Sequence, residues 1–285
     1  MGPRCAAAEN YAPPAAQSSC ALVSRFHGSD LSPMPGTLEE QRVAAAAEGG
    51  AEKRQFVRTT FEQIAPSYDL LNHLLSFNVD RRWRRRALRA LDWMRAPRGR
   101  YLDLCAGTLD VGALLAAQPG FAGFIVGADF AEAMLRAGAG KARRTVLAPL
   151  VADAQQLPIP DESMDGAIVA FGIRNVASLD STLREVHRVL RPGARFVILE
   201  FSTPRRAPVR WSYHLYFHHV LPFIGGIISG HRAAYRYLPR SVAHFPPERE
   251  LAARMAAAGF TNVRWHSLTF GVAAVHVGTK GEATC

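Results

Sequence analysis

The segment from Tyr101 to Asp110 constrains the fold of this chain more than any other. An apolar run that contains Asp103 is followed by a turn of small residues, and a second carboxylate, Asp110, stands where a helix is expected to begin. Further along, a second short apolar run at 124–129 also ends in an acid, Asp129. Strand, tight turn, helix, strand and acid in this order are typical of an open α/β sheet that binds an adenosine.

The turn itself narrows the class of ligand. It lacks the full G-x-G-x-x-G pattern of dinucleotide-binding proteins and has no Walker lysine, so little in it would hold a pyrophosphate. A phosphate-free adenosine ligand fits better, and S-adenosylmethionine is the common one. Gly107 is expected to let the ligand approach the backbone closely. Asp129 is expected to accept hydrogen bonds from both ribose hydroxyls.

Other polar residues follow the strands at the same predicted edge. Asp103 is placed to orient amides of the turn or to receive an ammonium group, and the alternative is a carboxylate that only caps the turn. Thr108 offers a hydroxyl and an amide to a carboxylate near a helix N-terminus, where partial positive charge favours an anion. Asp110 has a simpler alternative as the helix N-cap. Asp153 is placed to accept a hydrogen bond from an adenine amino group, with the Ala154 N–H facing a ring nitrogen; the alternative for Asp153 is a helix or turn cap.

The segment Phe171–Val176 follows the fourth predicted strand. An arginine at this edge, Arg174, is costly unless it is exposed or paired. It is placed to stabilise a phenolate or enolate on a substrate. An ion pair with Asp110 or Asp103 is the structural alternative, and the two roles are compatible. Asn175 would orient the same network.

The chain alternates strands and helices over most of its length. Its 285 residues are 48% hydrophobic, which is enough for one large domain with a tail or for two small domains. We predict an α/β fold of the Rossmann-like class I methyltransferase type, with a seven-stranded, mostly parallel sheet, an antiparallel C-terminal hairpin and helices on both faces. The predicted strands are 101–105, 124–129, 147–152, 166–171, 195–201, 262–268 and 271–278, and the predicted helices of the core are 110–117, 131–142, 179–191 and 247–258.

Composition divides the chain further. Residues 1–50 are rich in Ala, Pro, Ser and Gly and are predicted to form a disordered tail. The methyltransferase domain is predicted to span 51–285, with N-terminal helices in 51–95. The segment 204–246 breaks the alternation and is interpreted as a lid over the substrate, with ordinary core or a dimer interface as the alternative.

The spacing of the cysteines and the length of the apolar runs indicate the environment in which the protein folds. Cys5, Cys20, Cys105 and Cys285 have neither metal-ligand nor CxxC spacing, which indicates no metal site and a reducing cytoplasm. No apolar run approaches the roughly 20 residues of a membrane span.

The net charge is +10, and much of it lies in 81–86 and the arginines up to Arg100. Such a cluster suits nucleic acid or an anionic membrane surface. No RNA-binding signature accompanies it, so no nucleic acid partner is expected and we favour peripheral association with the inner face of the membrane. A solvated helix face is the alternative.

The ordered set of motifs resembles the ubiquinone/menaquinone biosynthesis C-methyltransferase family, over about Phe56 to Lys280. A lone cofactor turn would be weak evidence, but several segments occur in the family's order. They are Phe61 to Asn72, Ser76-Phe77 with Trp83-Arg84, Leu102 to Asp110, Phe171 to Val176, Arg188 to Gly193, Leu199 to Ser202, and Tyr235 to Val242.

The resemblance implies the cofactor and its contacts. S-adenosylmethionine would be held at Thr108, Asp129, Asp153-Ala154 and the position of Ala170. Two residues of the turn, Ala106 and Leu109, stand where many relatives carry glycines. Leu109 is expected to need a negative φ and to put its side chain near the cofactor.

The resemblance also implies the reaction, which is methyl transfer to a ring carbon of a polyprenylated hydroquinone, either demethylmenaquinol or 2-polyprenyl-6-methoxy-benzoquinol. Arg174 would steady the oxyanion, and Asp110 and Asn175 would orient Arg174 or a water that takes the proton. Other possibilities remain open: a non-catalytic protein that binds the same cofactor, a methyltransferase of another small molecule or of RNA, and a nicotinamide oxidoreductase. A homodimer is also left open.

Overall fold

The computed structural model describes residues 50–69, 76–216, 220 and 232–282. All of them belong to one compact unit, Gly36–Cys285. The predicted tail, apart from residue 50, lies outside the described residues, as do parts of the 204–246 segment. The same holds for Cys5, Cys20 and Cys285.

A seven-stranded sheet forms the centre of the fold, in the order β3-β2-β1-β4-β5-β7-β6. Strands β1 to β5 pair in parallel, and β7 is antiparallel to both of its neighbours, β5 and β6. The predicted fold class is therefore confirmed, with β7 inserted between β5 and β6. The strands are β1 (Arg100–Leu104), β2 (Phe124–Asp129), β3 (Leu147–Val151), β4 (Met164–Ala170), β5 (Leu190–Phe201), β6 (Phe260–Leu268) and β7 (Ala273–Lys280).

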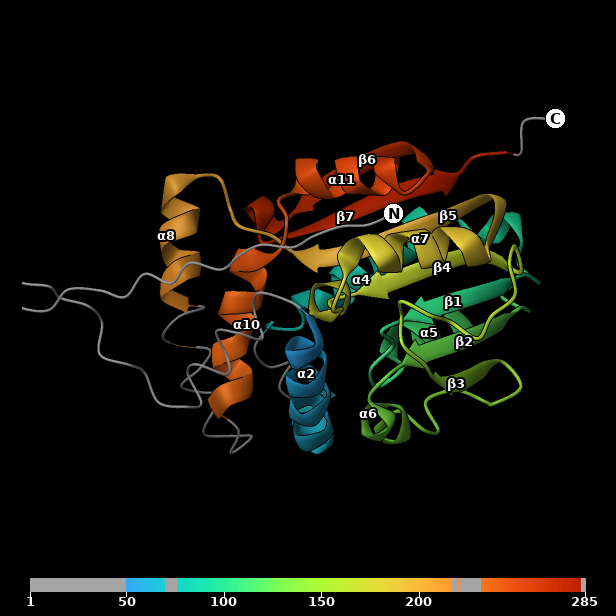
Figure 1. Ribbon diagram of the computed structural model, residues 1–285, viewed down its shortest axis with the longest axis horizontal. Helices are drawn as coiled ribbons and strands as arrows, with labels where there is room; N and C mark the ends of the chain where they lie inside the picture. The colour runs from blue at the N-terminus through green and yellow to red at the C-terminus, as the bar shows by residue number, and fades with distance from the viewer. Residues whose placement is uncertain (1–49, 70–75, 217–219, 221–231, 283–285) are drawn as a thin grey trace, which may run out of the picture. The chain divides into compact units, whose positions relative to one another are not determined.

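Helices cover both faces of this sheet (Figure 1). On one face α4 and α5 pack against a core cluster, and on the other α7 and α11 pack against a second cluster. The helices are α2 (Gly50–Ile64), α4 (Val79–Leu91), α5 (Asp110–Ala116), α6 (Glu132–Ala137), α7 (Leu179–Val189), α8 (Ala207–Leu215), α10 (Arg232–His244) and α11 (Glu248–Ala257), with short 3-10 turns η1 (Ala65–Ser67), η2 (Trp93–Arg95), η3 (Ile173–Asn175) and η5 (Thr269–Gly271).

Strand β1 shows how the apolar pattern produces these two layers. Leu102 and Leu104 point into the cluster under α7 and α11, while Tyr101 joins the cluster under α4 and α5. This is the alternation that a strand buried on both faces requires. It also turns Asp103 towards α5.

Three helices lie beyond the carboxyl ends of the parallel strands. In Figure 1, α2, α10 and α8 stand at the edge towards which the arrow of β5 points. Both α2 and α10 contact η3, the turn that follows β4, and they contact each other. The edge at which open α/β sheets bind ligands is therefore walled by helices from both ends of the chain.

Two predicted helix ends lie beyond those in the structure, one by five residues and the other by two. The helix predicted over 131–142 ends at Ala137, because Gly138 and Gly140 follow and Gly140 has a φ of +93°. The helix predicted to run to residue 191 ends at Val189, because β5 begins at Leu190, ahead of the Pro192-Gly193 stop signal. In both places strand or turn geometry prevailed over helical periodicity.

The expectation for Leu109 was also wrong. Its φ is +63°, and its side chain is 3% exposed within the cluster under α4 and α5. A Cβ on Gly127 of β2 would lie 2.3 Å from Leu109 Cδ2, so the glycine makes room for this leucine. A left-handed conformation is unfavourable for a residue with a Cβ. We infer that burial of the leucine side chain offsets that cost.

Two substitutions at Leu109 separate the backbone cost from the packing gain. Leu109→Ala should lower the free energy of unfolding by about 2–5 kcal/mol, because it leaves a cavity. Leu109→Gly should be more stable than Leu109→Ala by about 1 kcal/mol, because glycine tolerates positive φ. Urea denaturation of both variants measures the difference, and an alanine variant at least as stable as the glycine variant would contradict the assigned conformation.

Candidate active site

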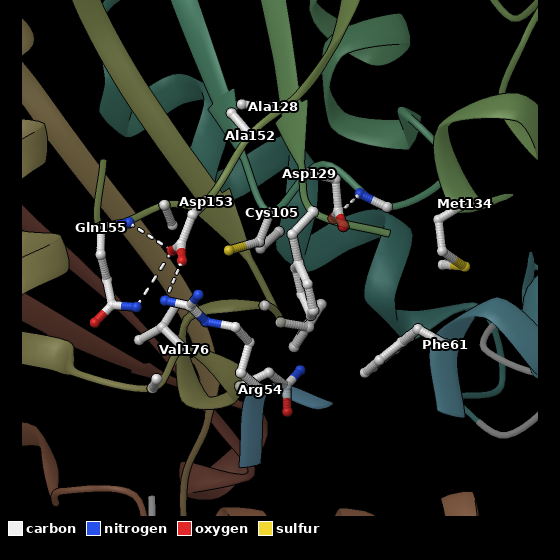
Figure 2. Close-up of a pocket in the computed structure, with 18 of the residues that line it drawn as sticks. Arg54, Phe61, Cys105, Ala128, Asp129, Met134, Ala152, Asp153, Gln155 and Val176 are labelled. Atoms are coloured by element: carbon white, nitrogen blue, oxygen red, sulfur yellow. Dashed lines mark hydrogen bonds and ion pairs between the residues drawn. The ribbon is translucent and has the colours of Figure 1, made fainter. Parts of the chain in front are cut away.

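A pocket lies at the carboxyl edge of the sheet, where β1, β2 and β4 end (Figure 2). The turn after β1 contributes Cys105 and Gly107 to its wall, and the N-terminal helical region contributes Phe61 and Tyr68 from the opposite side. Six residues that the sequence predicted as site residues line this pocket together: Gly107, Asp129, Asp153, Ala154, Ala170 and Asn175.

Asp129 fastens the turn after β1 as well as facing the pocket. Its Oδ2 accepts a hydrogen bond from the Gly107 N–H at 2.8 Å, and its Oδ1 accepts one from the Ala131 N–H at 2.9 Å. The side chain is largely buried, and burial raises the pKa of this carboxyl although the backbone donors counteract the rise. Each oxygen has a further lone pair for a ligand hydroxyl.

Asp153 joins the pocket to the N-terminal helix. Its Oδ1 accepts a hydrogen bond from the Gln155 N–H at 2.9 Å, so the predicted turn cap is present. Its Oδ2 lies 2.6 Å from Arg54 Nη2 of α2 (Figure 2). Arg54 also lines the pocket. No sequence pattern indicated a role for this arginine, because a solvated helix face explains an isolated arginine equally well.

The pocket suits the adenosine and methionine portions of S-adenosylmethionine. Gly107 has a φ of +51°, and its Cα faces the pocket without a side chain. Apolar side chains, among them Ala152, Ala154 and Val176, line the same pocket as the Asp153 carboxylate, which suits an adenine ring with one amino group. The Asn175 Oδ1 is buried and has no hydrogen-bond partner among the described residues. A donor on a ligand would satisfy it.

Asp103 and Thr108 do not line this pocket. Asp103 is 1% exposed, and its Oδ2 accepts a hydrogen bond from the Gly112 N–H at 2.7 Å, within the first turn of α5. Burial raises the pKa of this carboxyl to about 8. Asp103 therefore matches the structural alternative. Thr108 is buried, and its hydroxyl donates to Asp69.

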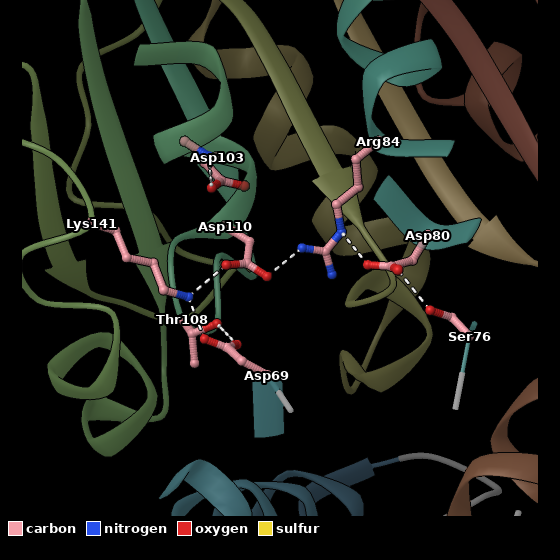
Figure 3. Close-up of polar contacts among 9 residues, drawn as sticks. Asp69, Ser76, Asp80, Arg84, Asp103, Thr108, Asp110 and Lys141 are labelled. Atoms are coloured by element: carbon pink, nitrogen blue, oxygen red, sulfur yellow. Dashed lines mark hydrogen bonds and ion pairs between the residues drawn. The ribbon is translucent and has the colours of Figure 1, made fainter. Parts of the chain in front are cut away.

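Asp110 is the centre of a charged network (Figure 3). Its two oxygens each lie 2.5 Å from a cation, Oδ2 from Arg84 Nη1 and Oδ1 from Lys141 Nζ. Although burial acts to raise its pKa, these charges hold the pKa of Asp110 below its usual value. Lys141 also pairs with Asp69, the residue that receives the Thr108 hydroxyl.

The other end of the network reaches α4. Arg84 Nε lies 3.6 Å from an oxygen of Asp80, and the Ser76 hydroxyl donates to the other Asp80 oxygen at 2.6 Å (Figure 3). Arg84 belongs to the predicted basic cluster, but it is 8% exposed and serves this network. Sequence reasoning missed Asp69, Asp80 and Lys141. The only signal was that Asp69 and Ser76 fall in segments that carry the family resemblance.

The expected partner of Arg174 was wrong. Arg174 pairs with Glu200 at the end of β5, with 2.7 Å between Nη1 and Oε1, and not with Asp110 or Asp103. Its Nη1 also donates to the Phe171 carbonyl, and its Nε donates to the Ser241 hydroxyl of α10 at 3.3 Å. The pair is buried on both sides, as a buried arginine requires. Asp110 therefore cannot orient Arg174 directly.

A second, larger cavity of about 340 Å³ adjoins the first pocket. The two share Phe61, Tyr68 and Phe171 in their walls. Its lining is mostly aromatic and aliphatic, and Asp80, Arg84 and Arg174 supply its charged groups. From the 204–246 segment it takes Val209, Ser212, Tyr213, Tyr216, Tyr237 and Leu238; residues 217–219 and 221–231 of that segment lie outside the described residues.

The chain resembles proteins of known family. Residues 49–280 match the model of the ubiE/COQ5 methyltransferase family. A demethylmenaquinone methyltransferase of Thermus thermophilus is 51% identical over 223 residues, which cover 77% of this chain and 99% of the relative. A ubiquinone/menaquinone biosynthesis C-methyltransferase UbiE of Geobacter sulfurreducens is 45% identical over 234 residues, 81% of this chain and 90% of the relative.

Solved structures agree on the fold. A SAM-dependent methyltransferase of Thermotoga maritima, described as a possible histamine N-methyltransferase, superposes with a TM-score of 0.54 at 19% identity, covering 78% of this chain and 98% of that one. A putative methyltransferase in complex with the Haloferax volcanii Trm112 activator superposes with a TM-score of 0.56 at 18% identity and the same coverage.

The raised pKa of Asp103 predicts how stability depends on pH. The carboxyl has a pKa of about 8 in the folded protein and an ordinary value of 3.8 in the unfolded chain. Between these values the unfolded state releases the proton more readily, so this group lowers stability as pH rises. Asp103→Asn keeps an oxygen for the Gly112 N–H and does not titrate. Its free energy of unfolding relative to the parent should therefore increase from pH 5 to pH 8, by at least about 2 kcal/mol. Urea denaturation at both pH values measures this, and a difference independent of pH would refute the assignment.

Proposed function

The chain belongs to the ubiE/COQ5 methyltransferase family, and on this premise we propose that it transfers a methyl group from S-adenosylmethionine to a ring carbon of a polyprenylated hydroquinone in respiratory quinone biosynthesis. The curated relatives named above carry activities of this kind in their names. The observation that supports the proposal most is the pair of adjoining cavities. One suits an adenosine ligand, the other is apolar and aromatic, and Phe171 lies in the wall between them.

S-adenosylmethionine supplies an electrophilic methyl group on its sulfonium. We assign ribose binding to Asp129, whose Oδ2 already accepts a hydrogen bond from the Gly107 N–H of the turn. Asp153 and Ala154 would hold the adenine edge, and Ala170 would contribute its backbone at the end of β4. Asn175 would accept a hydrogen bond from a ligand donor, since its Oδ1 has no other partner among the described residues.

The ring has to become a carbon nucleophile, and loss of a phenolic proton to a water would make the carbon ortho to the oxygen enolate-like. The hydrogen on that carbon would leave as a proton after the methyl group is attached, which restores the aromatic ring. Arg174 lines the apolar cavity, and its Nη2 makes no hydrogen bond among the described residues. We assign to Nη2 the donation of a hydrogen bond to the ring oxygen, where negative charge develops. Glu200 would fix the guanidinium in place, so that little reorganisation is needed.

Asp110 takes a different role from the one the sequence indicated. It holds Arg84, and the Arg84 guanidinium carbon lies 5.9 Å from the centre of the Phe171 ring. Asp110 is thus a positioning residue for the wall between the cavities. The apolar character of the larger cavity favours a ring with an isoprenoid tail over an RNA nucleotide, which would need polar partners for its base edges.

We also propose peripheral association with an anionic membrane surface, where such a substrate is dissolved. Arg81, Arg82, Arg85 and Arg86 of α4 are exposed, in contrast to Arg84. Within the part of the chain that the structure describes, none of the helices combines the length and the apolarity that crossing a bilayer requires.

Replacing Asp129 should weaken cofactor binding. Asp129→Ala removes a charged acceptor for ribose hydroxyls and releases the Gly107 turn, at a cost of roughly 1.5–3 kcal/mol, or about ten- to hundredfold in affinity. Calorimetric titration with S-adenosylmethionine measures the change. Glu132→Gln, which removes an exposed carboxylate from nearby α6, serves as the charge control and should bind as the parent does. Equal affinity of the Asp129 variant, in a folded protein, would take this residue out of the site.

The function and the role of Arg174 are tested together. The parent, incubated with labelled S-adenosylmethionine and each demethylated quinol in detergent, should yield a ring-methylated product from at least one of them. Arg174→Ala should lower turnover about 10²–10³-fold while changing cofactor affinity little, because its partner is charge on the substrate. Absence of product from both quinols would overturn the proposed function.

The Arg174 variant leaves Glu200 buried and unpaired, which could unfold the protein. The double variant Arg174→Gln, Glu200→Gln keeps a neutral hydrogen-bonding pair and isolates the charge effect. Arg184→Ala on the exposed surface of α7 is the matched control. Parental turnover in a folded double variant would disprove the role of the guanidinium.

A further inference from the structure

Four large apolar side chains are exposed at, or next in sequence to, residues that line the larger cavity. Phe77 is 76% exposed, Trp211 69%, Phe270 73% and Leu215 46%. We call these four residues the apolar rim. Phe77 itself lines the cavity, and its ring centre lies 6.1 Å from that of Tyr216, another lining residue. Phe270 follows Thr269, which lines the cavity as well.

Helix α8 is apolar on two opposite sides. Val209, Tyr213 and Tyr216 at its end face the cavity. Trp211 and Leu215 follow the helical repeat on the other side and are exposed. A helix on the surface of a globular protein normally turns charged and polar residues outwards. The outward side of α8 therefore indicates contact with an apolar medium or partner.

Two residues of the apolar rim, Phe77 and Phe270, have sterically unfavourable backbone conformations. Phe77 and Asn78 have φ of +52° and +58°, and Thr269 and Phe270 have φ of +45° and +57°. Left-handed conformations are rare for residues with a Cβ, and bulky side chains tolerate them least. Unlike Leu109, these phenylalanines gain little packing within the protein in return. Burial of both rings in an apolar medium would supply the missing compensation.

Exposed arginines accompany the rim. Arg81, Arg82, Arg85 and Arg86 follow Phe77 on α4, and none of them forms a salt bridge among the described residues. Arg206 and Arg210 lie at α8 and are likewise exposed. Cations next to exposed aromatic side chains suit a membrane interface, where arginines meet anionic headgroups and aromatic rings enter the acyl boundary.

We propose that the apolar rim and these arginines dock the protein on an anionic bilayer, so that the larger cavity opens towards the acyl chains. This inference rests on the proposed function for its substrate, a quinol whose isoprenoid tail keeps it in the membrane. The quinol would pass from the bilayer into the cavity without crossing water. The docking itself requires neither cofactor nor quinol, and can be tested without them.

Binding to vesicles tests the apolar part. The double variant Trp211→Ser, Phe270→Ser should bind vesicles of phosphatidylcholine and phosphatidylglycerol at least about tenfold more weakly than the parent. Met94→Ser is the matched control: Met94 is 71% exposed but lies beyond the opposite end of α4, so its loss should change nothing. Equal sedimentation of parent and double variant would overturn the proposal.

The salt dependence of vesicle binding distinguishes the contribution of the arginines from that of the apolar rim. Replacing Arg81, Arg82, Arg85 and Arg86 with glutamine should weaken binding at low salt, and the difference from the parent should shrink as salt rises. The loss in the Trp211, Phe270 variant should persist in high salt. An arginine variant that binds phosphatidylglycerol vesicles like the parent at low salt would refute the role of the cations.

Fluorescence reports the depth of docking. Trp265 is 37% exposed and is therefore replaced by phenylalanine in parent and variant alike. In this background brominated lipids should quench the tryptophan emission, and Trp211→Phe should remove most of that quenching, since Trp83 and Trp93 are buried. Equal quenching in parent and variant would place Trp211 outside the bilayer and contradict the proposal.

A second copy of the chain is the competing occupant of the rim. Sedimentation velocity that shows a dimer in the parent, lost in the Trp211, Phe270 variant while vesicle binding is unchanged, would assign the surface to self-association and overturn membrane docking. Activity on detergent-dispersed quinol, which should persist in this variant, shows whether a failure lies in docking or in the proposed chemistry.

Discussion

Asp110 forms two salt bridges that connect the turn after β1 to two other parts of the chain. Arg84 comes from α4, and Lys141 comes from the segment that follows α6, so one carboxylate at the start of α5 joins three parts of the chain. Arg84 and Asp110 are removed from most of the surrounding water, and a buried charge is tolerated only when it is paired. The network thus fixes α4, and with it one wall of the larger cavity, relative to the turn after β1.

That coupling gives the two cavities a common wall. Phe171 lies between them, its ring centre 4.7 Å from that of Phe201, and each of the two rings has an arginine near its face, Arg84 at Phe171 and Arg174 at Phe201. Methyl transfer requires donor and acceptor to be aligned in line, with each positioned to within a fraction of an ångström, and water to be excluded. A wall of packed rings with anchored guanidinium groups provides the rigidity that this geometry demands.

Backbone strain is concentrated at the same edge of the sheet. Cys105 and Phe171, which begin the turns after β1 and β4, have φ of +49° and +62°. Leu109 shows the same conformation with a clear compensation, because its side chain is buried. At Phe77 and Phe270 the compensation within the protein is small, because both side chains are largely exposed, and this supports their burial in a bilayer. A strained backbone conformation of this kind persists where contacts within the protein, or with a partner, hold it in place.

The sequence by itself determined the layers of the fold and the acids at the strand ends. Apolar runs of strand length are separated by helical repeats and are followed by Asp129 or Asp153. This pattern indicates a parallel sheet whose ligand-binding edge lies at these acids. It can be predicted from sequence because the spacing of apolar residues and the direction of side chains along a strand or helix are local properties. The ordered motifs likewise indicated the family before any geometry was known.

Only the tertiary structure decided which charges meet. Arg174 pairs with Glu200, 26 residues away; Arg84 pairs with Asp110, also 26 residues away; and Lys141 pairs with Asp69, 72 residues away. The sequence offered several acids for each arginine, and the attraction between charges depends on distance and burial, neither of which the order of residues specifies. The conformation of Leu109 was decided in the same way, since the space beside Gly127 that offsets its strain exists only once β2 lies against β1.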